Sequence, residues 1–343
     1  MTVHLTGLGT YVPPETMTGA DIAAESGVPE EVVTEKMGVR EKRVCRGEGD
    51  HPSDMCVAAA SEALADADCE AADLDAVRYH GSECKDYVVW SLAADVADRL
   101  GATGAYASES YALCAGTPVA MREAVAQLEA DALDRVLLVA ASREEDLVDY
   151  DDPDTSFTFN FGSGASAFVL ESDAATADTA ERSLATVHGS AAVTDGSFSR
   201  DVVMPGGGTR NPPSEESVAK GMHAFRVPDH ETMKERLGEV SLPNFLEVAD
   251  TALDRSDRER ADLDFAAITH MKRSFHEYLC SELGLDEREQ YYLDEYGHVQ
   301  AVDQALATEE ARARGYLDSG DTVLYLAAGT GYTWAATVLE WQD

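Results

Sequence analysis

Short apolar runs alternate with longer amphipathic stretches along the whole chain. Runs typical of strands occupy residues 3–12, 76–82, 135–142, 165–170, 184–193, 265–271, 322–329 and 333–341. Between them, apolar positions recur at helical spacing in residues 60–67, 89–101 and 118–132. This order of elements predicts an α/β fold in which helices cover the faces of sheets.

The two halves of the chain end in similar ways. RVLLVAAS (135–142) is followed by a loop and then by FGSGASAFVL (161–170), and TVLYLAAG (322–329) leads directly into TGYTWAATVLEW (330–341). Each pair is typical of a strand, a glycine-containing turn and a second strand. We therefore expect a duplicated architecture with halves at 1–175 and 176–343. A stretch rich in glycine, proline and charge at 204–243 predicts a loop or cap insertion.

The 343 residues carry 65 acidic and 26 basic side chains, which gives a formal net charge of −39. The acids are dispersed through predicted helical segments such as 61–77 and 251–265. Such a spread is typical of a halophilic protein, whose solvated acidic surface suits very high salt. A surface for cations or basic partners is the alternative. Nucleic acid is disfavoured as a partner, because binding to phosphates requires positive charge.

No run of eighteen apolar residues occurs, so we expect no membrane span. The first residues, MTVHLTGLGTYVPP, lack a basic region before a short apolar block, and we expect no signal peptide. The six cysteines have no CxxC spacing, so neither a metal site nor a disulfide framework is predicted. Reduced thiols favour a cytoplasmic location.

Cys114 is the main candidate for a nucleophile. It lies between a short apolar segment and a stretch in which Val119, Val125 and Leu128 share one helix face, so we expect a strand-to-helix turn there. The partial positive charge at a helix N-terminus favours a thiolate. A buried structural cysteine is the alternative that the spacing leaves open.

Two histidines and a glycine-rich turn are the candidate partners of Cys114. His270 ends a strand-like run, His298 follows a glycine, and each precedes a predicted helix. Imidazoles in such positions can hydrogen-bond a thioester carbonyl or move a proton. Thr330 lies between two glycines, where its backbone N–H and that of Cys114 would form an oxyanion hole.

Together these features resemble the beta-ketoacyl synthase III family of the thiolase superfamily over nearly the whole chain. Four segments are similar to the family's glycine–tyrosine–proline start, its Gly-Ile-x-x-Arg segment, its FGDGA strand and its GGGxTWG ending. They are GLGTYVPPETMT (7–18), MGVREKR (37–43), DPDTSFTFNFGSGASAFVL (152–170) and GTGYTWAATVLEW (329–341).

The resemblance implies a thiolase-like five-layered αβαβα fold, a homodimer and a ping-pong acyltransferase with no permanently bound cofactor. An acyl group would pass from coenzyme A or an acyl-carrier protein to Cys114, and the carbanion of a second thioester would then attack it. His270 matches the first residue of the family's His-Gln-Ala-Asn motif. His298 matches the asparagine of its Gly-Asn motif, and Thr330 the glycine whose N–H completes the oxyanion hole.

For the binding of coenzyme A, the resemblance implies Lys36, Arg40 and Arg273. Val32 and Lys36 stand where the family has the tryptophan and arginine that enclose the adenine. The aspartate of the FGDGA strand is Ser163.

The two histidine motifs also depart from the family pattern. THMKRS (269–274) replaces the His-Gln-Ala-Asn stretch, and GHVQAVDQ (297–304) replaces Gly-Asn-x-x-x-Ala. The implied catalytic set is therefore Cys-His-His, as in the elongating synthases, with two imidazole donors for the thioester carbonyl.

GSECKDY (81–87) places Glu83 at the end of a predicted strand. The setting is similar to that of the catalytic glutamate in 3-hydroxy-3-methylglutaryl-CoA synthases. A carboxylate there would deprotonate an acetyl thioester and allow condensation without decarboxylation. A surface glutamate in a strongly acidic protein is the alternative.

Three functional hypotheses follow. The first is condensation of the Cys114-bound acyl group with a malonyl-type thioester to a 3-oxoacyl product. The second is an alternative reaction of the acyl group. It is either transfer to an amine or hydroxyl, or condensation without decarboxylation, in which Glu83 helps to form a 3-hydroxy-3-methylglutaryl- or acetoacetyl-type product. The third is a non-catalytic partner subunit of another synthase. No motif fixes the acyl chain length, which we expect to depend on residues near 84–92 and 196–230.

Overall fold

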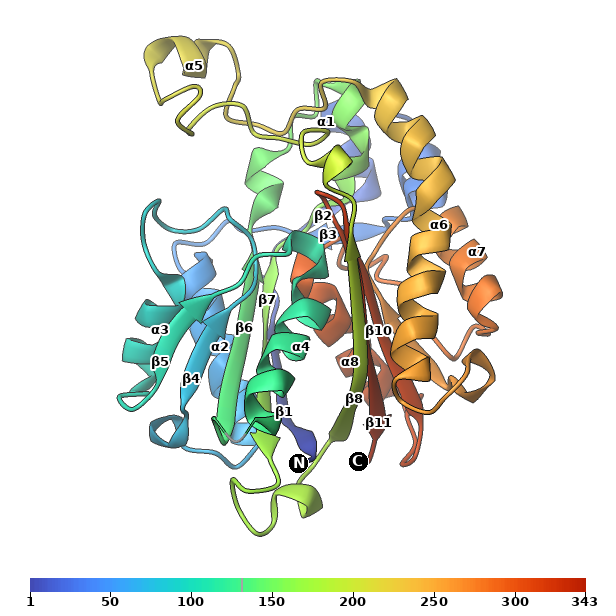
Figure 1. Ribbon diagram of the computed structural model, residues 1–343. Coiled ribbons are helices and arrows are strands. Elements are labelled where there is room, and N and C mark those ends of the chain that lie inside the picture. Colours follow the sequence, from blue (N-terminus) through green and yellow to red (C-terminus); the bar gives the residue numbers. More distant parts are fainter. Residues whose placement is uncertain (131) are drawn as a thin grey trace.

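A nine-stranded sheet with the order β5-β4-β6-β7-β1-β8-β11-β10-β9 forms the centre of the computed structural model, which describes residues 1–130 and 132–343 (Figure 1). Two further strands, β2 and β3, pair separately. The strands are β1 Val3–Tyr11, β2 Thr16–Thr18, β3 Glu41–Arg43, β4 Ala76–Tyr79, β5 Tyr106–Glu109, β6 Arg135–Ser142, β7 Gly164–Ser172, β8 Ala185–Thr194, β9 Phe265–Ile268, β10 Thr322–Gly329 and β11 Thr333–Trp341.

The α-helices lie between the strands in the chain and cover the faces of the sheet. They are α1 Gly19–Ser26, α2 Pro52–Asp66, α3 Leu92–Leu100, α4 Gly116–Glu129, α5 Glu215–Ala219, α6 His230–Asp254, α7 Arg273–Leu283 and α8 Asp303–Arg314. Among the described residues, no helix is both long enough and apolar enough to cross a bilayer.

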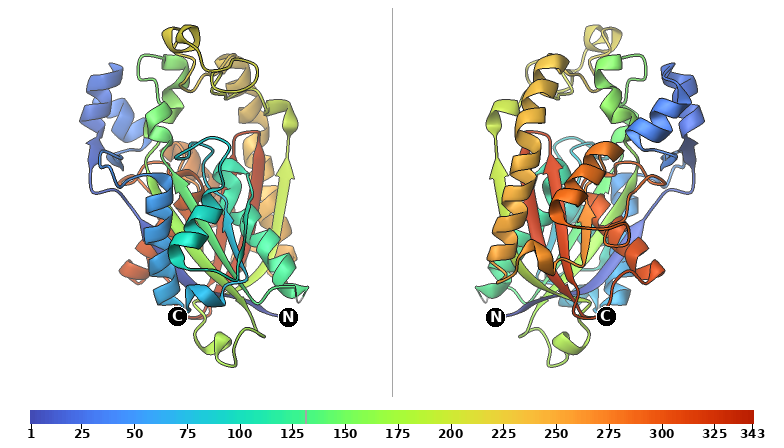
Figure 2. Two further views of the ribbon diagram at one scale, coloured as in Figure 1. Left: turned by 90° about the vertical axis from the view of Figure 1, so that its left-hand side faces the viewer. Right: turned by 90° about the vertical axis from the view of Figure 1, so that its right-hand side faces the viewer.

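The sheet consists of two parts that share only a short edge. β1 pairs with β8 over residues 3–5, and beyond this point the strands β5-β4-β6-β7-β1 and β8-β11-β10-β9 diverge. α4 contacts β6 and β7 of the first part and β8 and β11 of the second, and α8 contacts β7 and β9, so both helices lie between the parts (Figure 1). α2 and α3 cover one outer face, and α6 and α7 cover the other (Figure 2). This is the five-layered αβαβα fold that the resemblance implies.

The strand order repeats in the two parts. β4-β6-β7-β1 and β9-β10-β11-β8 follow one pattern, in which the first pair is parallel and the next two pairs are antiparallel. α4 and α8 precede equivalent strands. The repeat agrees with a duplicated architecture, although the division between residues 175 and 176 stays a prediction.

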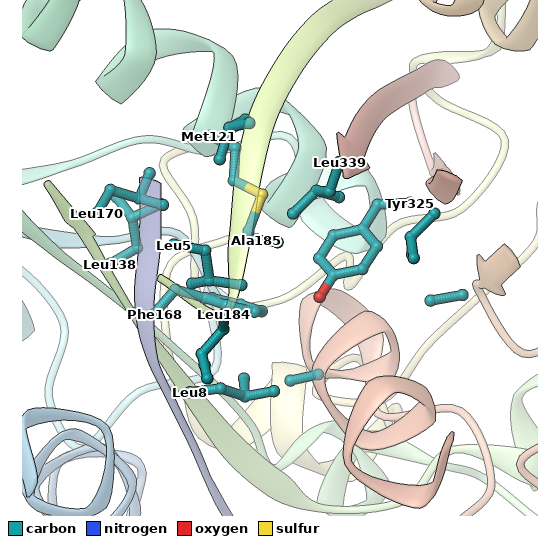
Figure 3. Close-up of a cluster of buried hydrophobic side chains, with 14 of the residues drawn as sticks. Leu5, Leu8, Met121, Leu138, Phe168, Leu170, Leu184, Ala185, Tyr325 and Leu339 are labelled. Carbon is teal, nitrogen blue, oxygen red and sulfur yellow. The ribbon is translucent and has the colours of Figure 1, made fainter. Parts of the chain in front are cut away.

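The central layer encloses the largest hydrophobic core (Figure 3). Leu5 of β1, Phe168 of β7 and Tyr325 of β10 point into it together with Met121 of α4, and none of the four side chains is exposed to solvent. The Tyr325 hydroxyl accepts a hydrogen bond from Thr308 of α8 at 2.9 Å, so the polar end of this ring is also satisfied. The core therefore joins both parts of the sheet to both central helices.

Glycines on β1 allow α2 to approach the backbone of this strand. A Cβ atom on Gly7 would lie 2.1 Å from the Ala63 carbonyl oxygen, and one on Gly9 would lie 2.3 Å from that of Ala59. The alanines of α2 present no bulk toward the strand either. The GLGTY start of the chain is thus explained by close packing between a helix and a strand.

The main sheet strands that the apolar runs predict are all present, but other predictions were wrong. The stretch 204–243 is not all loop, because α6 begins at His230. The segments 61–77 and 251–265 are helical only in their first part, since α2 ends at Asp66 and α6 at Asp254. The edge strand β5 was missed. The predicted helix 118–132 is α4, and residue 131 lies outside the described residues.

We predict that Gly9→Ala lowers the free energy of unfolding by about 2 kcal/mol, because the added methyl group has to displace the backbone of α2. Gly49→Ala is the matched control, since a Cβ atom there meets nothing within 4 Å. Denaturant unfolding at one fixed salt concentration measures both changes. Equal effects of the two substitutions would contradict the packing argument.

Candidate active site

Cys114 lies in a tight turn between β5 and the central helix α4. The turn is a 3-10 helix, Leu113–Ala115, and α4 begins at the next residue. Leu113 has a φ of 51°, in the left-handed region, so the turn that precedes the cysteine is strained. Cys114 is 5% exposed. The predicted strand-to-helix position of this residue agrees with the structure.

The hairpin between β10 and β11 closes over this turn. A Cβ atom on Gly329 would lie 2.4 Å from the Ala112 carbonyl oxygen and 3.0 Å from the backbone nitrogen of Cys114. Only glycine allows this approach. Thr330, the next residue, lines the same cavity as Cys114, which places the predicted oxyanion-hole residue beside the predicted nucleophile.

His298 is the histidine in contact with Cys114. Its Nε2 atom lies 3.1 Å from the cysteine Sγ atom, and its Nδ1 atom donates to Oδ2 of Asp303 at 2.7 Å. The backbone of His298 is held on both sides by the segment before β7, since its N–H donates to the Asn160 carbonyl and its carbonyl accepts from Gly162. The site therefore contains a Cys-His-Asp arrangement.

Asp303 begins α8 and is fully buried. Besides the His298 ring, its carboxylate accepts the backbone N–H groups of His270 and Val299, each at 2.7 Å. A helix N-terminus stabilises negative charge, which suits a buried carboxylate at this position. Asp303 thus fixes the ring of one histidine and the backbone of the other.

The charges around His298 favour its protonated form. Burial alone would lower the pKa of His298, but the Asp303 carboxylate, followed by the sulfur of Cys114, outweighs it and raises the pKa well above the usual value. The protonated imidazole therefore faces the sulfur of Cys114.

His270 lines the same cavity, but both of its ring nitrogens are engaged. Nε2 lies 3.3 Å from the Gly38 carbonyl oxygen, and Nδ1 lies 3.1 Å from the amide nitrogen of Asn160. These partners assign the proton to Nε2, because a carbonyl can only accept. Burial lowers the pKa of His270 to about 4, so the ring is neutral. In this arrangement His270 has no free N–H for a thioester, and its catalytic role stays a prediction.

A buried glutamate, Glu144, lies close enough to His298 to interact with its charge. It accepts hydrogen bonds from the Ser82 hydroxyl at 2.6 Å and from the side chain of Gln300. Burial raises the pKa of Glu144 to about 7, against the opposing effects of the Ser82 bond and the charge of His298. Its ionisation state therefore changes near neutral pH.

Glu83, the predicted base, lies on the surface. Its side chain is exposed and forms no hydrogen bond or ion pair within residues 1–130 and 132–343. It does not line the cavity around Cys114. The structure does not bring Glu83 together with Cys114 and His298.

Two adjoining cavities lead from Cys114 toward the surface. The inner cavity has a volume of about 240 Å³ and is lined by Cys114, His270, His298 and Thr330 together with apolar side chains. The outer cavity has a volume of about 620 Å³. Phe157 and Tyr332, among others, line both. A long, narrow substrate could therefore reach the sulfur from outside.

Positive charge gathers at the outer cavity. Lys36, Lys234 and Lys272 line it, and they are three of the six lysines in the chain. None of the three forms an ion pair or a hydrogen bond among the residues that the structure describes. Three uncompensated cations at one opening are notable in a chain with a net charge of −39.

The two arginines predicted to bind coenzyme A have partners within the protein. Arg40 and Arg273 both pair with Asp294, at 3.0 and 2.8 Å. Arg273 also stacks on the Tyr292 ring, 4.3 Å from its centroid. Their charges are partly neutralised, and their role in binding stays a prediction. No cluster suited to a metal ion occurs among the described residues.

Sequence reasoning missed Asp303, Asn160 and Glu144. Asp303 follows His298 by five residues within GHVQAVDQ, so both lie near the start of one helix, and this spacing was the available signal. Asn160 directly precedes the FGSGA strand. Glu144 lies in the acidic run REED (143–146), which has the composition of a surface loop and gave no signal.

We predict that iodoacetamide at pH 7 labels Cys114 ahead of the other cysteines, because within residues 1–130 and 132–343 it is the one thiol in contact with an imidazolium. Burial raises the pKa of the other thiols: Cys45, Cys56, Cys69, Cys84 and Cys280. Intact-mass spectrometry should find one adduct, and His298→Ala should slow its formation about tenfold. Cys114→Ala is the control, and labelling of this variant at the wild-type rate would contradict the assignment.

Comparisons with known proteins agree with the fold and with the motifs. The family model for 3-oxoacyl-[acyl-carrier-protein] synthase III matches residues 109–192, and the model for its C-terminal part matches residues 253–341. Together they cover just over half of the chain.

Relatives match over nearly their whole length. The beta-ketoacyl-[acyl-carrier-protein] synthase III of Aliarcobacter butzleri is 28% identical, with 97% of this chain and 96% of the relative covered. The enzyme of the same name from Ruegeria pomeroyi is 29% identical, with 98% of each covered.

Solved structures support the same fold. The crystal structure of 3-oxoacyl-(acyl carrier protein) synthase III from Pseudomonas aeruginosa has a TM-score of 0.84 at 24% identity, and covers 100% of this chain and 99% of the other. The chain therefore belongs to the beta-ketoacyl synthase III family of the thiolase superfamily, a family of acyltransferases.

Proposed function

We propose that the protein takes an acyl group from a thioester onto Cys114 and condenses it with a second, malonyl-type thioester to a 3-oxoacyl product. The observation that carries the proposal is the 3.1 Å distance between the Cys114 Sγ and His298 Nε2 atoms at the inner end of a cavity. The names of the relatives support it, since they are beta-ketoacyl-[acyl-carrier-protein] synthases III.

In the loading step, the Cys114 thiolate attacks the thioester carbonyl. The backbone N–H groups of Cys114 and Thr330 would stabilise the oxyanion of the tetrahedral intermediate. When this intermediate collapses, the thiolate of the carrier leaves and takes the proton of His298 Nε2. The products are acyl-Cys114, a free carrier thiol and a neutral His298.

In the condensation step, the carbanion of the second thioester attacks the acyl-Cys114 carbonyl. The bond between carbon and sulfur breaks, and Cys114 leaves as a thiolate. Decarboxylation of a malonyl group would supply this carbanion without a strong base. The exposed position of Glu83 gives no support to condensation without decarboxylation.

The lysines at the outer cavity suit a carrier with phosphate groups. Coenzyme A and the phosphopantetheine arm of an acyl-carrier protein share this chemistry, and both are long and narrow enough for the two adjoining cavities. Lys36, Lys234 and Lys272 would bind the phosphates as point charges. A non-catalytic partner subunit would need neither these cations nor the Cys114–His298 pair.

A second copy of the chain is the proposed partner in solution. β5 is an edge strand, and Lys85 of the loop between β4 and α3 pairs with Glu109 at the end of β5. In this loop Tyr87, Val88 and Val89 are 68%, 90% and 105% exposed. An apolar loop beside an unpaired edge strand suits an interface between copies. Light scattering measures the molar mass, and a monomer would contradict the proposal.

The net charge and the free thiols support a proposed environment of high salt in a reducing cytoplasm. A net charge of −39 suits very high salt, and the protein should keep its activity there. All six cysteines are free, which supports a reducing cytoplasm. The dependence of activity on salt concentration tests the proposed high-salt environment. Cell fractionation tests the proposed cytoplasmic location.

We predict that an acyl-CoA adds the mass of its acyl group to Cys114, because the thiolate is the attacking group. Intact-mass spectrometry at high salt, over a panel of acyl chain lengths, detects the adduct. The matched control is Cys114→Ala, which should gain no mass. A folded wild type that stays unlabelled with every acyl chain length would overturn the proposal.

Lys36→Ala and Lys234→Ala should each raise the acyl-CoA concentration for half-maximal loading about threefold, and leave the saturated rate unchanged. Each substitution removes a cation from the outer cavity, and neither residue lines the inner cavity. The assay requires the lowest salt at which the protein stays folded, because salt screens these charges. Lys220→Ala is the control, since Lys220 pairs with Glu216 on α5. An equal effect of all three substitutions on half-maximal loading would contradict a role of the outer-cavity lysines in binding the carrier.

A further inference from the structure

The protonation of His298 changes during loading, and the hydrogen bonds around it determine where the remaining proton lies. Before loading, the ring carries protons on both nitrogens, and the leaving thiolate removes the one on Nε2. Nδ1 keeps its proton because it donates to Asp303 at 2.7 Å. In acyl-Cys114 the lone pair of Nε2 therefore points at the thioester that it has just helped to form.

A lone pair in this position accepts a proton and cannot donate one. An asparagine, the residue of the family motif at this place, has the opposite property, because its amide donates without ionising. His270 does not compensate, since its ring nitrogens already interact with Gly38 and Asn160. The acylated site thus holds a base beside an electrophile.

We infer that acyl-Cys114 also transfers its acyl group to an O–H nucleophile, either water or an alcohol, with His298 as the general base and Asp303 as the residue that positions it. This second activity rests on the acyl loading of the proposed function. Water gives hydrolysis and an alcohol gives an ester, and the chemistry is the same up to the identity of the group on oxygen.

The step balances without any further reagent. The oxygen of the nucleophile forms a bond to the acyl carbon while its proton passes to Nε2 of His298. The bond between that carbon and the sulfur of Cys114 breaks, and the electron pair stays on sulfur. The thiolate–imidazolium pair is restored. With water the product is a carboxylic acid, which releases its own proton to solvent; with an alcohol it is an ester.

The surroundings of His298 and the adjoining cavities fit this step. The titratable groups that face the ring are Cys114 from the turn before α4, Asp303 from α8, His270 from the segment after β9, and Glu144 from the turn after β6. The inner cavity adjoins the outer one, so a small O–H molecule can reach the thioester.

The test separates loading from release. The wild type is acylated with the acyl-CoA that labels it best, freed of excess acyl-CoA by desalting, and followed by intact mass from pH 5.5 to pH 9 without a second thioester. Parallel samples contain buffer alone or buffer with 1-propanol as the probe. Mass spectrometry identifies the free acid or the propyl ester, and thereby distinguishes the two acceptors.

We expect the acyl group to leave Cys114 at a rate that rises with pH and then levels off as His298 loses its proton. Asp303→Asn should slow release about 100-fold on the plateau and move the inflection to lower pH, because the imidazolium has lost its carboxylate. Asp257→Asn, at an exposed residue with a φ of 54° that asparagine tolerates, is the matched control and should behave as the wild type.

A second variant covers the case in which Asp303→Asn does not fold. His298→Asn introduces the residue of the family motif and should keep any acyl group it acquires. Release at the same rate in wild type and variants, or release only after a malonyl thioester is added, would overturn the inference and leave the proposed function standing. Failure to form acyl-Cys114 at all would overturn both the inference and the proposed function. The intact mass measured directly after desalting, before release is followed, identifies that outcome.

Discussion

The carboxylate of Asp303 is the group on which the active site depends. Its two oxygens accept the ring N–H of His298 and the backbone N–H groups of His270 and Val299. It therefore joins the segment after β9 to the turn before α8, and it fixes one imidazole in a single orientation. An unpaired carboxylate at this depth would be unfavourable, but here both oxygens are hydrogen-bonded and the helix N-terminus adds favourable charge.

The duplicated fold explains how the nucleophile and this carboxylate come to lie on either side of one histidine. α4 and α8 occupy equivalent places in the central layer, and both start at the end of the sheet that carries the β10–β11 hairpin. Cys114 precedes the first helix and Asp303 begins the second. Each helix N-terminus favours a negative charge, on sulfur in one case and on oxygen in the other. His298 lies between them, with Nε2 at the sulfur and Nδ1 at the carboxylate.

The sequence was sufficient for the parts of the structure that depend on local pattern. The long strands follow from apolar runs bounded by glycine, and Cys114 was predicted at a strand-to-helix turn. The start of α6 was missed because its first two turns are mostly polar and the helix contains Pro243, which is unusual inside a helix. The engagement of His270 could not be predicted, since it depends on the Gly38 carbonyl, which lies far away in the chain. The sequence pointed to Glu83 and gave no signal for Glu144, but in the structure Glu83 is exposed and Glu144 is buried.

The replacement of an amide by an imidazole changes what the site does after loading. An asparagine keeps the same protons through both half-reactions, so it can stabilise a developing enolate at any stage. His298 instead alternates between a donor and an acceptor, because Asp303 holds one of its protons and the chemistry removes the other. The residues proposed to load the acyl group are then the residues that can activate a protic acceptor. The fate of the acyl group would therefore depend less on the catalytic residues than on which molecule reaches the inner cavity, and the shape and charge of the outer cavity control that access.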